Sequence, residues 1–186
     1  KLLAFAEHSA ARRYLGARVI GVRLGTVGRQ LLTIDRGADD GVARMMPVVV
    51  GEGVVGRVHQ VAGHSADVLV VTDSNSAVAV RVDRTRARGN VRGMGKPDLC
   101  NLEYALRTED VMEGDVLVTS GTDGVFPRGL PVGKVTQVAR EKHGLFQDAR
   151  VVPAVDVTRL EEVLVVTSFE RSDEVMPAAY APGTRP

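Results

Sequence analysis

The sequence predicts an all-β fold, in which two small β-barrel domains follow a short N-terminal helix. Apolar residues make up 44% of the 186 residues, but aromatic residues only 4%, and Trp is absent. Compact branched side chains must therefore fill the core, and they suit the tapered interiors of small barrels. From about residue 17 to 168, short β-branched runs of period two alternate with turn residues, which favours a sandwich or barrel over βαβ units.

A strand–turn–strand unit occurs twice in the chain. It reads PVVVGEGVVGRVHQV at 47–61 and DVLVTSGTDGVFPRGLPVGKVTQV at 115–138, and Gly56 corresponds to Gly133 with an offset of 77 residues. Each copy continues into a further strand-like stretch that ends in Asp. The offset favours two domains rather than one. Because no catalytic residue recurs at matching positions, the repeat indicates a protein that is contacted by others rather than one that performs chemistry.

Residues 1–16 are predicted to form the helix. Ala, Leu, Glu and Arg dominate this segment, no Gly or Pro interrupts it, and Gly16 stands where a C-cap glycine ends a helix. The spacing of Leu3, Ala6 and Ala10 fits either a solvated lead-in helix or the end of a longer coiled coil.

The two barrels are expected over residues 17–95 and 96–168. In the first, Gly41 and the Gly51–Gly53 turn separate strands predicted at 31–37, 46–50, 53–61, 67–73 and 78–82. Segments 87–93 and 99–106 form the next hairpin. The boundary is approximate, and the sequence leaves open whether strands are exchanged between the barrels. Residues 169–186 contain three prolines and few core formers, a composition typical of a disordered tail.

Charge and metal-ligand content exclude several classes of function. The net charge is +1, so no global field favours nucleic acid or anionic lipid. The lone Cys100 excludes an internal disulfide and a cysteine metal site. No two of the four histidines have metal-ligand spacing. No metal, cofactor, nucleic acid or small-molecule substrate is therefore expected.

One local charge asymmetry lies in residues 81–92, where arginines occupy five positions: Arg81, Arg84, Arg86, Arg88 and Arg92. Arginines on alternating strand positions can follow a phosphate backbone, so a nucleic-acid-binding module stays open as a hypothesis. Few aromatic residues are present for base stacking, which favours a solvated barrel surface.

An active or decayed trypsin-like serine hydrolase is the alternative to a binding protein. Its candidate residues are Ser120 with His64 and either Asp67 or Asp73. The segment around Ser120 lacks the G-x-S-x-G elbow and the residues that surround a protease serine. A polar hairpin tip is therefore the simpler interpretation. Convergence of the three side chains in the structure would favour the hydrolase.

The succession LTIDRGADDGV, MPVVVGEGVVGRV, VLVVTDSNSAVAVRV, GDVLVTSGTDGVFPRGLPVGKV and PAVDVTRLEEVLVV resembles the extracytoplasmic region of the rod shape-determining MreC family, over about residues 17–167. The resemblance implies an N-terminal transmembrane helix absent from this sequence, a dimerising coiled coil and two barrels in the periplasm. It also implies a non-enzymatic scaffold of the cell-elongation machinery. The implied partners are a class B penicillin-binding transpeptidase, MreD and other membrane proteins, and a second copy in a homodimer or filament.

A scaffold of this kind binds partners through exposed apolar side chains. The candidate anchors are Phe126, Leu130, Tyr104 and Phe146. For Phe126 and Leu130 the alternative interpretation, that they plug one end of a barrel, is favoured.

Overall fold

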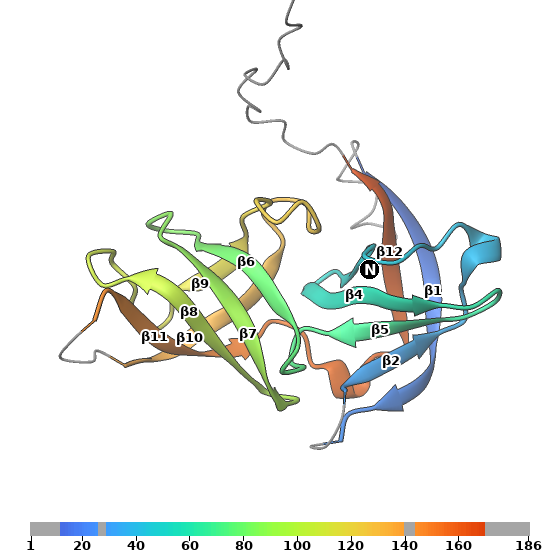
Figure 1. The fold of residues 1–186 in the computed structure, drawn as a ribbon, viewed down its shortest axis with the longest axis horizontal. Helices are drawn as coiled ribbons and strands as arrows, with labels where there is room; N and C mark the ends of the chain where they lie inside the picture. The colour runs from blue at the N-terminus through green and yellow to red at the C-terminus, as the bar shows by residue number, and fades with distance from the viewer. Residues whose placement is uncertain (1–11, 26–28, 140–143, 170–186) are drawn as a thin grey trace, which may run out of the picture.

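The computed structural model describes residues 12–25, 29–139 and 144–169, and these residues form two closed β-barrels that lie side by side (Figure 1). The first barrel consists of β1 (Arg12–Arg23), β2 (Leu31–Ile34), β3 (Pro47–Val50), β4 (Gly53–Val61), β5 (Ala66–Val70) and β12 (Glu162–Phe169). The second consists of β6 (Ala77–Val82), β7 (Arg88–Lys96), β8 (Leu99–Leu106), β9 (Val116–Thr119), β10 (Pro131–Ala139) and β11 (Phe146–Pro153). Two 3-10 turns, η1 (Ala38–Asp40) and η2 (Val157–Arg159), complete the described elements. The predicted all-β, two-barrel fold is confirmed.

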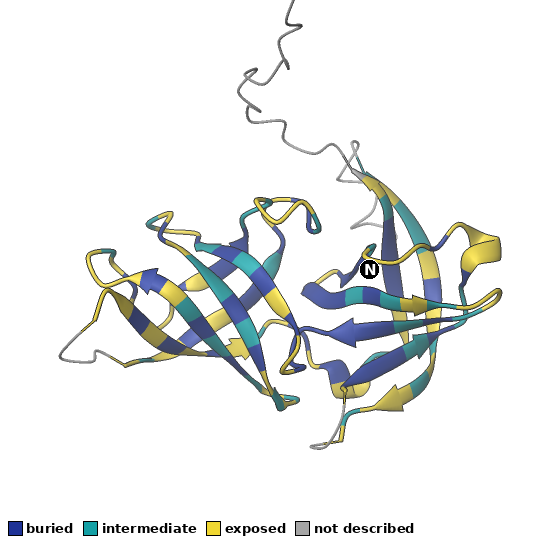
Figure 2. Ribbon diagram, viewed as in Figure 1, coloured by how far each residue is buried: buried dark blue, intermediate teal, exposed yellow. Residues whose placement is uncertain are grey.

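Period-two patterning produces these strands. In β6, Val78, Val80 and Val82 are buried while the residues between them are more exposed, and Figure 2 shows similar alternation along β8 and β11. Valine dominates both cores, as the composition predicts. Small branched side chains fill a six-stranded barrel that bulky aromatic side chains would overfill.

The glycine shared by both copies of the repeat is required by close strand packing. A Cβ on Gly56 would lie 2.1 Å from the Leu69 carbonyl oxygen, and one on Gly133 would lie 2.6 Å from the Val152 carbonyl oxygen. The ladder shifts register beside both glycines. The V-G-[R/K]-V motif therefore marks a sharply packed position of β4 and β10.

The two barrels share one circular strand order but exchange their sixth strands. The order β3-β4-β5-β2-β1-β12 in the first barrel corresponds to β9-β10-β11-β8-β7-β6 in the second. Strands β1 to β5 all belong to the first barrel, and strands β7 to β11 all belong to the second. The next strand after β5, which is β6, closes the second barrel. Conversely, β12 follows β11 and closes the first barrel. This exchange resolves the question that the sequence leaves open.

The exchange corrects the predicted domain boundaries. A division between residues 95 and 96 would separate β7 from β8, which are hydrogen-bonded neighbours in one barrel. The second barrel instead occupies 77–153 as an insertion, and the first combines 12–70 with 162–169. Local strand patterns carry no information on which neighbour a strand pairs with, so the linear division was wrong.

The predicted N-terminal helix is also corrected where the structure describes it. Residues 12–16 form the start of β1, where pairing with residues 164–169 of β12 satisfies backbone groups that the predicted helix would have bonded internally. Residues 1–11, which carry the rest of the helix and coiled-coil prediction, lie outside the described residues. The predicted tail begins with Phe169, which is the last residue of β12, and residues 170–186 lie outside the described part.

A buried polar junction joins the barrels. The Thr72 hydroxyl donates to Gln30 Oε1 at 2.7 Å, and Gln30 Nε2 donates to the Gly95 carbonyl at 2.8 Å. The Gly95 amide in turn donates to the Thr72 carbonyl at 2.9 Å. Gln30 and Thr72 are buried, so the bond between their side chains is shielded from water, whereas the bond to Gly95 is partly buried. One apolar cluster also extends across the junction, from Val49 and Val54 to the core of the second barrel.

Within the described segments, helices of a length and apolarity suited to crossing a bilayer are absent.

Candidate partner-binding surface

Exposed apolar side chains of the second barrel gather where β8 ends and β11 begins. Tyr104 is 56% exposed, Leu106 41%, Leu145 74% and Phe146 46%; these four residues are called the aromatic patch below. Leu106 and Phe146 are direct partners in the β8–β11 ladder. The rings of Tyr104 and Phe146 meet edge to face, with centroids 5.6 Å apart at an interplanar angle of 85°. The patch is therefore a preformed set of anchors rather than scattered side chains.

The backbone at Tyr104 is strained. Its φ is +62°, in the left-handed region that bulky side chains avoid at a cost of about 1–2 kcal/mol. The β8–β11 ladder shifts register here: two residues, Glu103 and Tyr104, separate the paired residues Leu102 and Ala105. This bulge breaks the alternation and leaves Tyr104 exposed next to Glu103. An exposed aromatic side chain on strained backbone is typical of a contact site.

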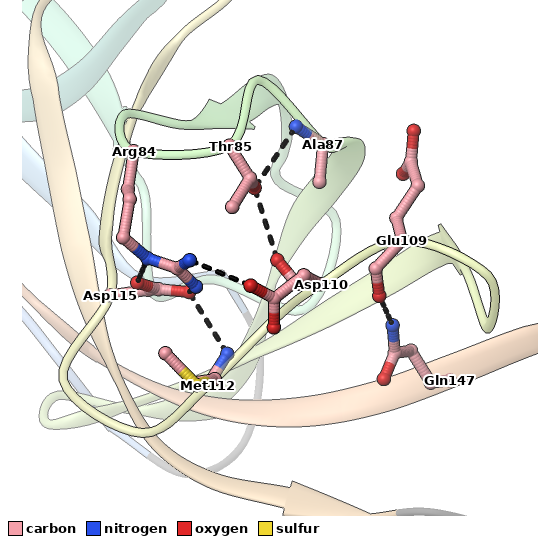
Figure 3. A network of polar contacts seen from close by, with 8 residues as sticks. All are labelled: Arg84, Thr85, Ala87, Glu109, Asp110, Met112, Asp115 and Gln147. Carbon is pink, nitrogen blue, oxygen red and sulfur yellow. Dashed lines mark hydrogen bonds and ion pairs between the residues drawn. The ribbon is translucent and has the colours of Figure 1, made fainter.

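An ion-pair network holds the loop that follows the patch (Figure 3). Arg84 Nε donates to Asp115 at 2.9 Å, and Arg84 Nη1 donates to Asp110 at 2.7 Å. Asp115 also accepts from the Met112 amide at 2.9 Å. The hydrogen bonds from Arg84 and from the Met112 amide lower the pKa of Asp115, and those to Asp115 and Asp110 raise the pKa of Arg84. The loop between β8 and β9 is thereby tied to the β6–β7 turn.

Gln147 ties the same loop to β11. Its Nε2 donates to the Leu106 carbonyl at 2.9 Å and to the Glu109 carbonyl at 2.8 Å. Gln147 is buried although it lies between exposed neighbours in β11. These two hydrogen bonds from Gln147 fix the backbone that carries the aromatic patch.

Two of the four predicted anchors are not exposed. Phe126 and Leu130 have only 2% and 3% of their surface accessible and belong to the core cluster of the second barrel. The Leu130 amide donates to the buried Thr119 hydroxyl, which fixes the loop over the barrel interior. Their prediction as surface anchors is wrong, and the alternative, burial within the barrel, describes both residues. Tyr104 and Phe146 are exposed and adjacent, as an anchor requires.

Sequence reasoning missed Leu106 and Leu145. Leu106 lies two residues beyond Tyr104 near the end of the same strand, and Leu145 directly precedes Phe146. The available signal was an apolar pair, Leu145 and Phe146, at the start of a strand that otherwise alternates. Only the β8–β11 pairing brings the two segments together.

The candidate serine, histidine and aspartates are not brought together. The Ser120 hydroxyl pairs with Thr122 in the β9–β10 loop of the second barrel. His64 pairs with Asp39 at 3.1 Å, in the β4–β5 turn of the first barrel. Asp67 and Asp73 are also held by residues other than Ser120 and His64. Across the described residues no hydrogen bond links Ser120 to this histidine or to either aspartate.

The described residues contain neither a cluster of metal ligands nor an accessible thiol. In segments 12–25, 29–139 and 144–169, no three His, Cys, Asp or Glu side chains are placed to hold a metal ion. Cys100 is buried, and burial raises its pKa to about 12. Such a thiol is a structural core residue.

A concave surface lies between the barrels, with a volume of about 410 Å³. Residues 43–47 of the first barrel, 166–168 of β12 and 124–125 of the second barrel line it. Met45 is the one large apolar side chain of this lining that is strongly exposed. The aromatic patch therefore has the stronger apolar character.

Comparisons with known proteins agree with this architecture. The sequence model described as "Rod shape-determining protein MreC, barrel core" matches residues 19–167. The cell shape-determining protein MreC of Haemophilus influenzae is 34% identical over 138 residues, covering 74% of this chain and 39% of that protein. The chain thus spans about two fifths of the length of this curated relative.

Solved structures share the two-barrel fold. The crystal structure of MreC from Pseudomonas aeruginosa has a TM-score of 0.79 and 36% identity, covering 83% of this chain and 99% of that one. A complex between a penicillin-binding protein (PBP2) and MreC from Helicobacter pylori matches with a TM-score of 0.66. Its identity is 16%, over 84% of this chain and 98% of that one, so this likeness concerns the fold alone.

Proposed function

Because the chain belongs to the MreC family of cell shape-determining proteins, we propose that it is a non-enzymatic scaffold of the cell-elongation machinery. Its barrels bind a class B penicillin-binding transpeptidase on the extracytoplasmic side of the cytoplasmic membrane and so organise peptidoglycan synthesis. The observation that carries the proposal is the aromatic patch, in which four apolar side chains stay exposed on a strained and internally supported strand pair.

The choice of partner has two supports. The Helicobacter pylori structure with the same fold is a complex of MreC with a penicillin-binding protein. In this chain, the paired rings of Tyr104 and Phe146 have the character of interface hot spots, which are enriched in aromatic residues and centred in an apolar cluster. A scaffold without an assembled nucleophile acts through such a surface.

Contacts with MreD and other membrane proteins, and self-association as a homodimer or filament, belong to the same proposal. Self-association is tested by light scattering on the chain with and without residues 1–11. The deletion stops before Arg12 because Arg12 pairs with Phe169 in the barrel wall. A halved mass indicates association through the N-terminal segment, and an unchanged dimer mass places association on the barrels.

Transpeptidase binding is tested with the double variant Tyr104→Glu, Phe146→Glu. Loss of a hot spot costs about 2 kcal/mol or more, so we expect the affinity for the purified transpeptidase ectodomain to fall at least about tenfold. The matched control is Ile20→Glu, Val22→Glu, which replaces two exposed apolar side chains on β1 of the first barrel. Circular dichroism checks that both variants are folded. Equal affinity of the patch variant and the control would contradict the proposal.

A further inference from the structure

Arginines within residues 81–92 differ in whether an acidic side chain neutralises them. Arg84 and Arg92 form ion pairs at distances of 2.7–2.9 Å. Arg81, Arg86 and Arg88 form no ion pair with any acidic side chain of the described residues, and Arg86 lies in the β6–β7 turn. The arginine cluster of the sequence therefore separates into structural members and members with uncompensated charge.

Arg81 is held against the barrel without an acceptor. It lies on β6 between the inward-facing Val80 and Val82, so its side chain is on the outer surface. Its Nε and Nη1 atoms are covered by protein and lack a hydrogen-bond partner. Each such donor costs about 1–3 kcal/mol. The partly buried guanidinium therefore keeps an unneutralised positive charge at a fixed place on the barrel surface, and a negative charge on a partner would compensate it.

Arg88 increases this uncompensated charge. It is the direct partner of Arg81 in the antiparallel β6–β7 ladder, so both side chains leave the same face of the sheet. Like charges directly opposite each other destabilise a ladder. The carboxylate of Glu109 accepts from the backbone amide of Arg88 at 3.3 Å, but it forms no ion pair with either guanidinium. A negative charge between the two arginines would relieve the repulsion.

Arg88 lies on the strand next to the aromatic patch, and Arg81 lies one strand further away. The strands that carry them are consecutive neighbours in the order β11-β8-β7-β6. Arg88 begins β7 at the end where the antiparallel β8 finishes with Leu106, and Arg81 lies opposite Arg88. Apolar anchors and free positive charge thus share one end of the second barrel.

We propose that Arg81 and Arg88 extend the aromatic patch into a docking face for an acidic protein segment, in which carboxylate side chains flank apolar ones. This inference rests on the proposed function in placing the partner on the patch, and it defines the chemistry of that partner. Charge complementarity at the rim of an apolar centre is the usual organisation of a protein interface.

A nucleic acid fits this face less well. Affinity for a phosphate backbone grows with the number of cationic contacts, and here three arginines without ion pairs lie near apolar side chains on a chain of net charge +1. An acidic protein segment matches both the charge and the apolar surface.

The test compares the double reversal Arg81→Glu, Arg88→Glu with the wild-type chain in binding the transpeptidase ectodomain. We expect the association rate to fall about tenfold and to lose most of its dependence on salt between about 50 and 300 mM, since charges at an interface act mainly on association. The charge-matched control is Arg13→Glu, Arg44→Glu, two exposed arginines of the first barrel that also have no acidic partner in the described residues. The control is expected to change the rate less than about twofold.

The outcomes separate this inference from the proposed function. If Tyr104→Glu, Phe146→Glu abolishes binding while the arginine reversal matches its control, the proposed function stands and the acidic docking face is overturned. If the wild-type chain does not bind the transpeptidase, the proposed function fails, and a ten-residue polyglutamate peptide then tests the face alone. A shift of the Arg81 Nε–Hε signal on adding the peptide supports the inference, and an unshifted signal overturns it. Tighter arginine-dependent binding of single-stranded DNA or of phosphatidylglycerol vesicles than of the peptide also overturns it.

Discussion

The β2–β5 ladder of the first barrel corresponds to the β8–β11 ladder of the second, but the residue pair at the end of the ladder is buried in the first barrel and exposed in the second. In the first barrel the β2–β5 ladder ends with Ile34 opposite Ala66, and both are buried. In the second, the β8–β11 ladder ends with Leu106 opposite Phe146, and both are exposed. Two barrels of one topology therefore differ in whether this end is available to a partner.

The loop after the ladder accounts for part of this difference. In the first barrel, η1 folds onto the β4–β5 turn: the Ala38 amide donates to the Ala62 carbonyl at 2.9 Å, and the Asp39 amide to the Gly63 carbonyl at 3.0 Å. Gly37 permits this approach, because a Cβ there would lie 2.3 Å from the Ala62 carbonyl oxygen. In the second barrel the corresponding loop is bonded instead to Arg84 and Gln147. The comparison teaches that the hydrogen bonds of the loop, rather than barrel topology, decide which of these ends is exposed.

The largest expected effect is that of removing β12, the strand that closes the first barrel. Ending the chain after Glu161 removes β12, which lies between β1 and β3, whereas all six strands of the second barrel remain. We expect the first barrel to unfold and the second to stay folded, because two unpaired edges open the first barrel and its core. Hydrogen exchange at Val58 and Val91 reports on the two barrels separately. A chain ending after Phe169 is the control, and equal loss of protection in both barrels would show that they fold as one unit.

The shared glycines are expected to be of unequal importance. Gly56→Ala should lower the free energy of unfolding by about 3 kcal/mol, because three backbone atoms of β5 lie within 2.9 Å of the new Cβ. Gly133→Ala should cost about 2 kcal/mol, since one of its closest contacts is the Val151 side chain, which can move. Gly16→Ala, with no atom within 4 Å of its Cβ, is the control. Denaturant unfolding measures all three, and a smaller loss for Gly56 than for Gly133 would reverse the ranking.

Acid is expected to weaken the second barrel through Asp115. Hydrogen bonds from Arg84 and the Met112 amide lower its pKa in the folded state. The carboxylate therefore stabilises the fold above its unfolded pKa of about 4, and this contribution is lost as the pH falls through the lower folded value. Unfolding free energies measured from about pH 7 to pH 2 should decline less steeply for Asp115→Asn.

The first barrel provides the control for this prediction. The pKa of Asp35 is also lowered, first by the backbone amide and then by the side chain of Arg18. Its side chain is 18% exposed, against 7% for Asp115, so water screens the Asp35 pair more strongly. Asp35→Asn should change the acid dependence less than Asp115→Asn, and the opposite order would contradict the assignment.

The smallest expected effect lies in the β6–β7 turn. Arg86 has a φ of +67°, a left-handed conformation that glycine occupies at Gly41 of the first barrel, where φ is +84°. Arg86→Gly should raise the free energy of unfolding by about 1 kcal/mol, because glycine adopts this conformation without steric cost. Arg128→Gly is the control, since Arg128 is exposed in a loop but is not among the residues with positive φ. An unchanged melting temperature for Arg86→Gly would show that the turn relaxes around the arginine.

Much of the candidate surface lay beyond sequence patterns. All four candidate anchors were predicted as exposed apolar side chains, but only Tyr104 and Phe146 are exposed, whereas Phe126 and Leu130 are buried. A loop residue turns inward or outward according to hydrogen bonds such as that between Thr119 and Leu130, which join distant positions. Likewise, nothing in the arginine cluster distinguished Arg84, which finds Asp115, from Arg81, which finds no acid.

The sequence by itself determined that valine-rich strands of period two would close into two barrels, and that Gly56 and Gly133 would occupy equivalent places in them. These properties are local: side-chain volume, alternation and the space beside a glycine are set within one or two strands. Only the tertiary structure decided that β6 and β12 are exchanged and that Arg81 stays without an acidic partner on the same sheet as the aromatic patch. The physical reason is that strand pairing depends on backbone hydrogen bonds, which every residue except proline can form, so a strand pattern does not specify its neighbour.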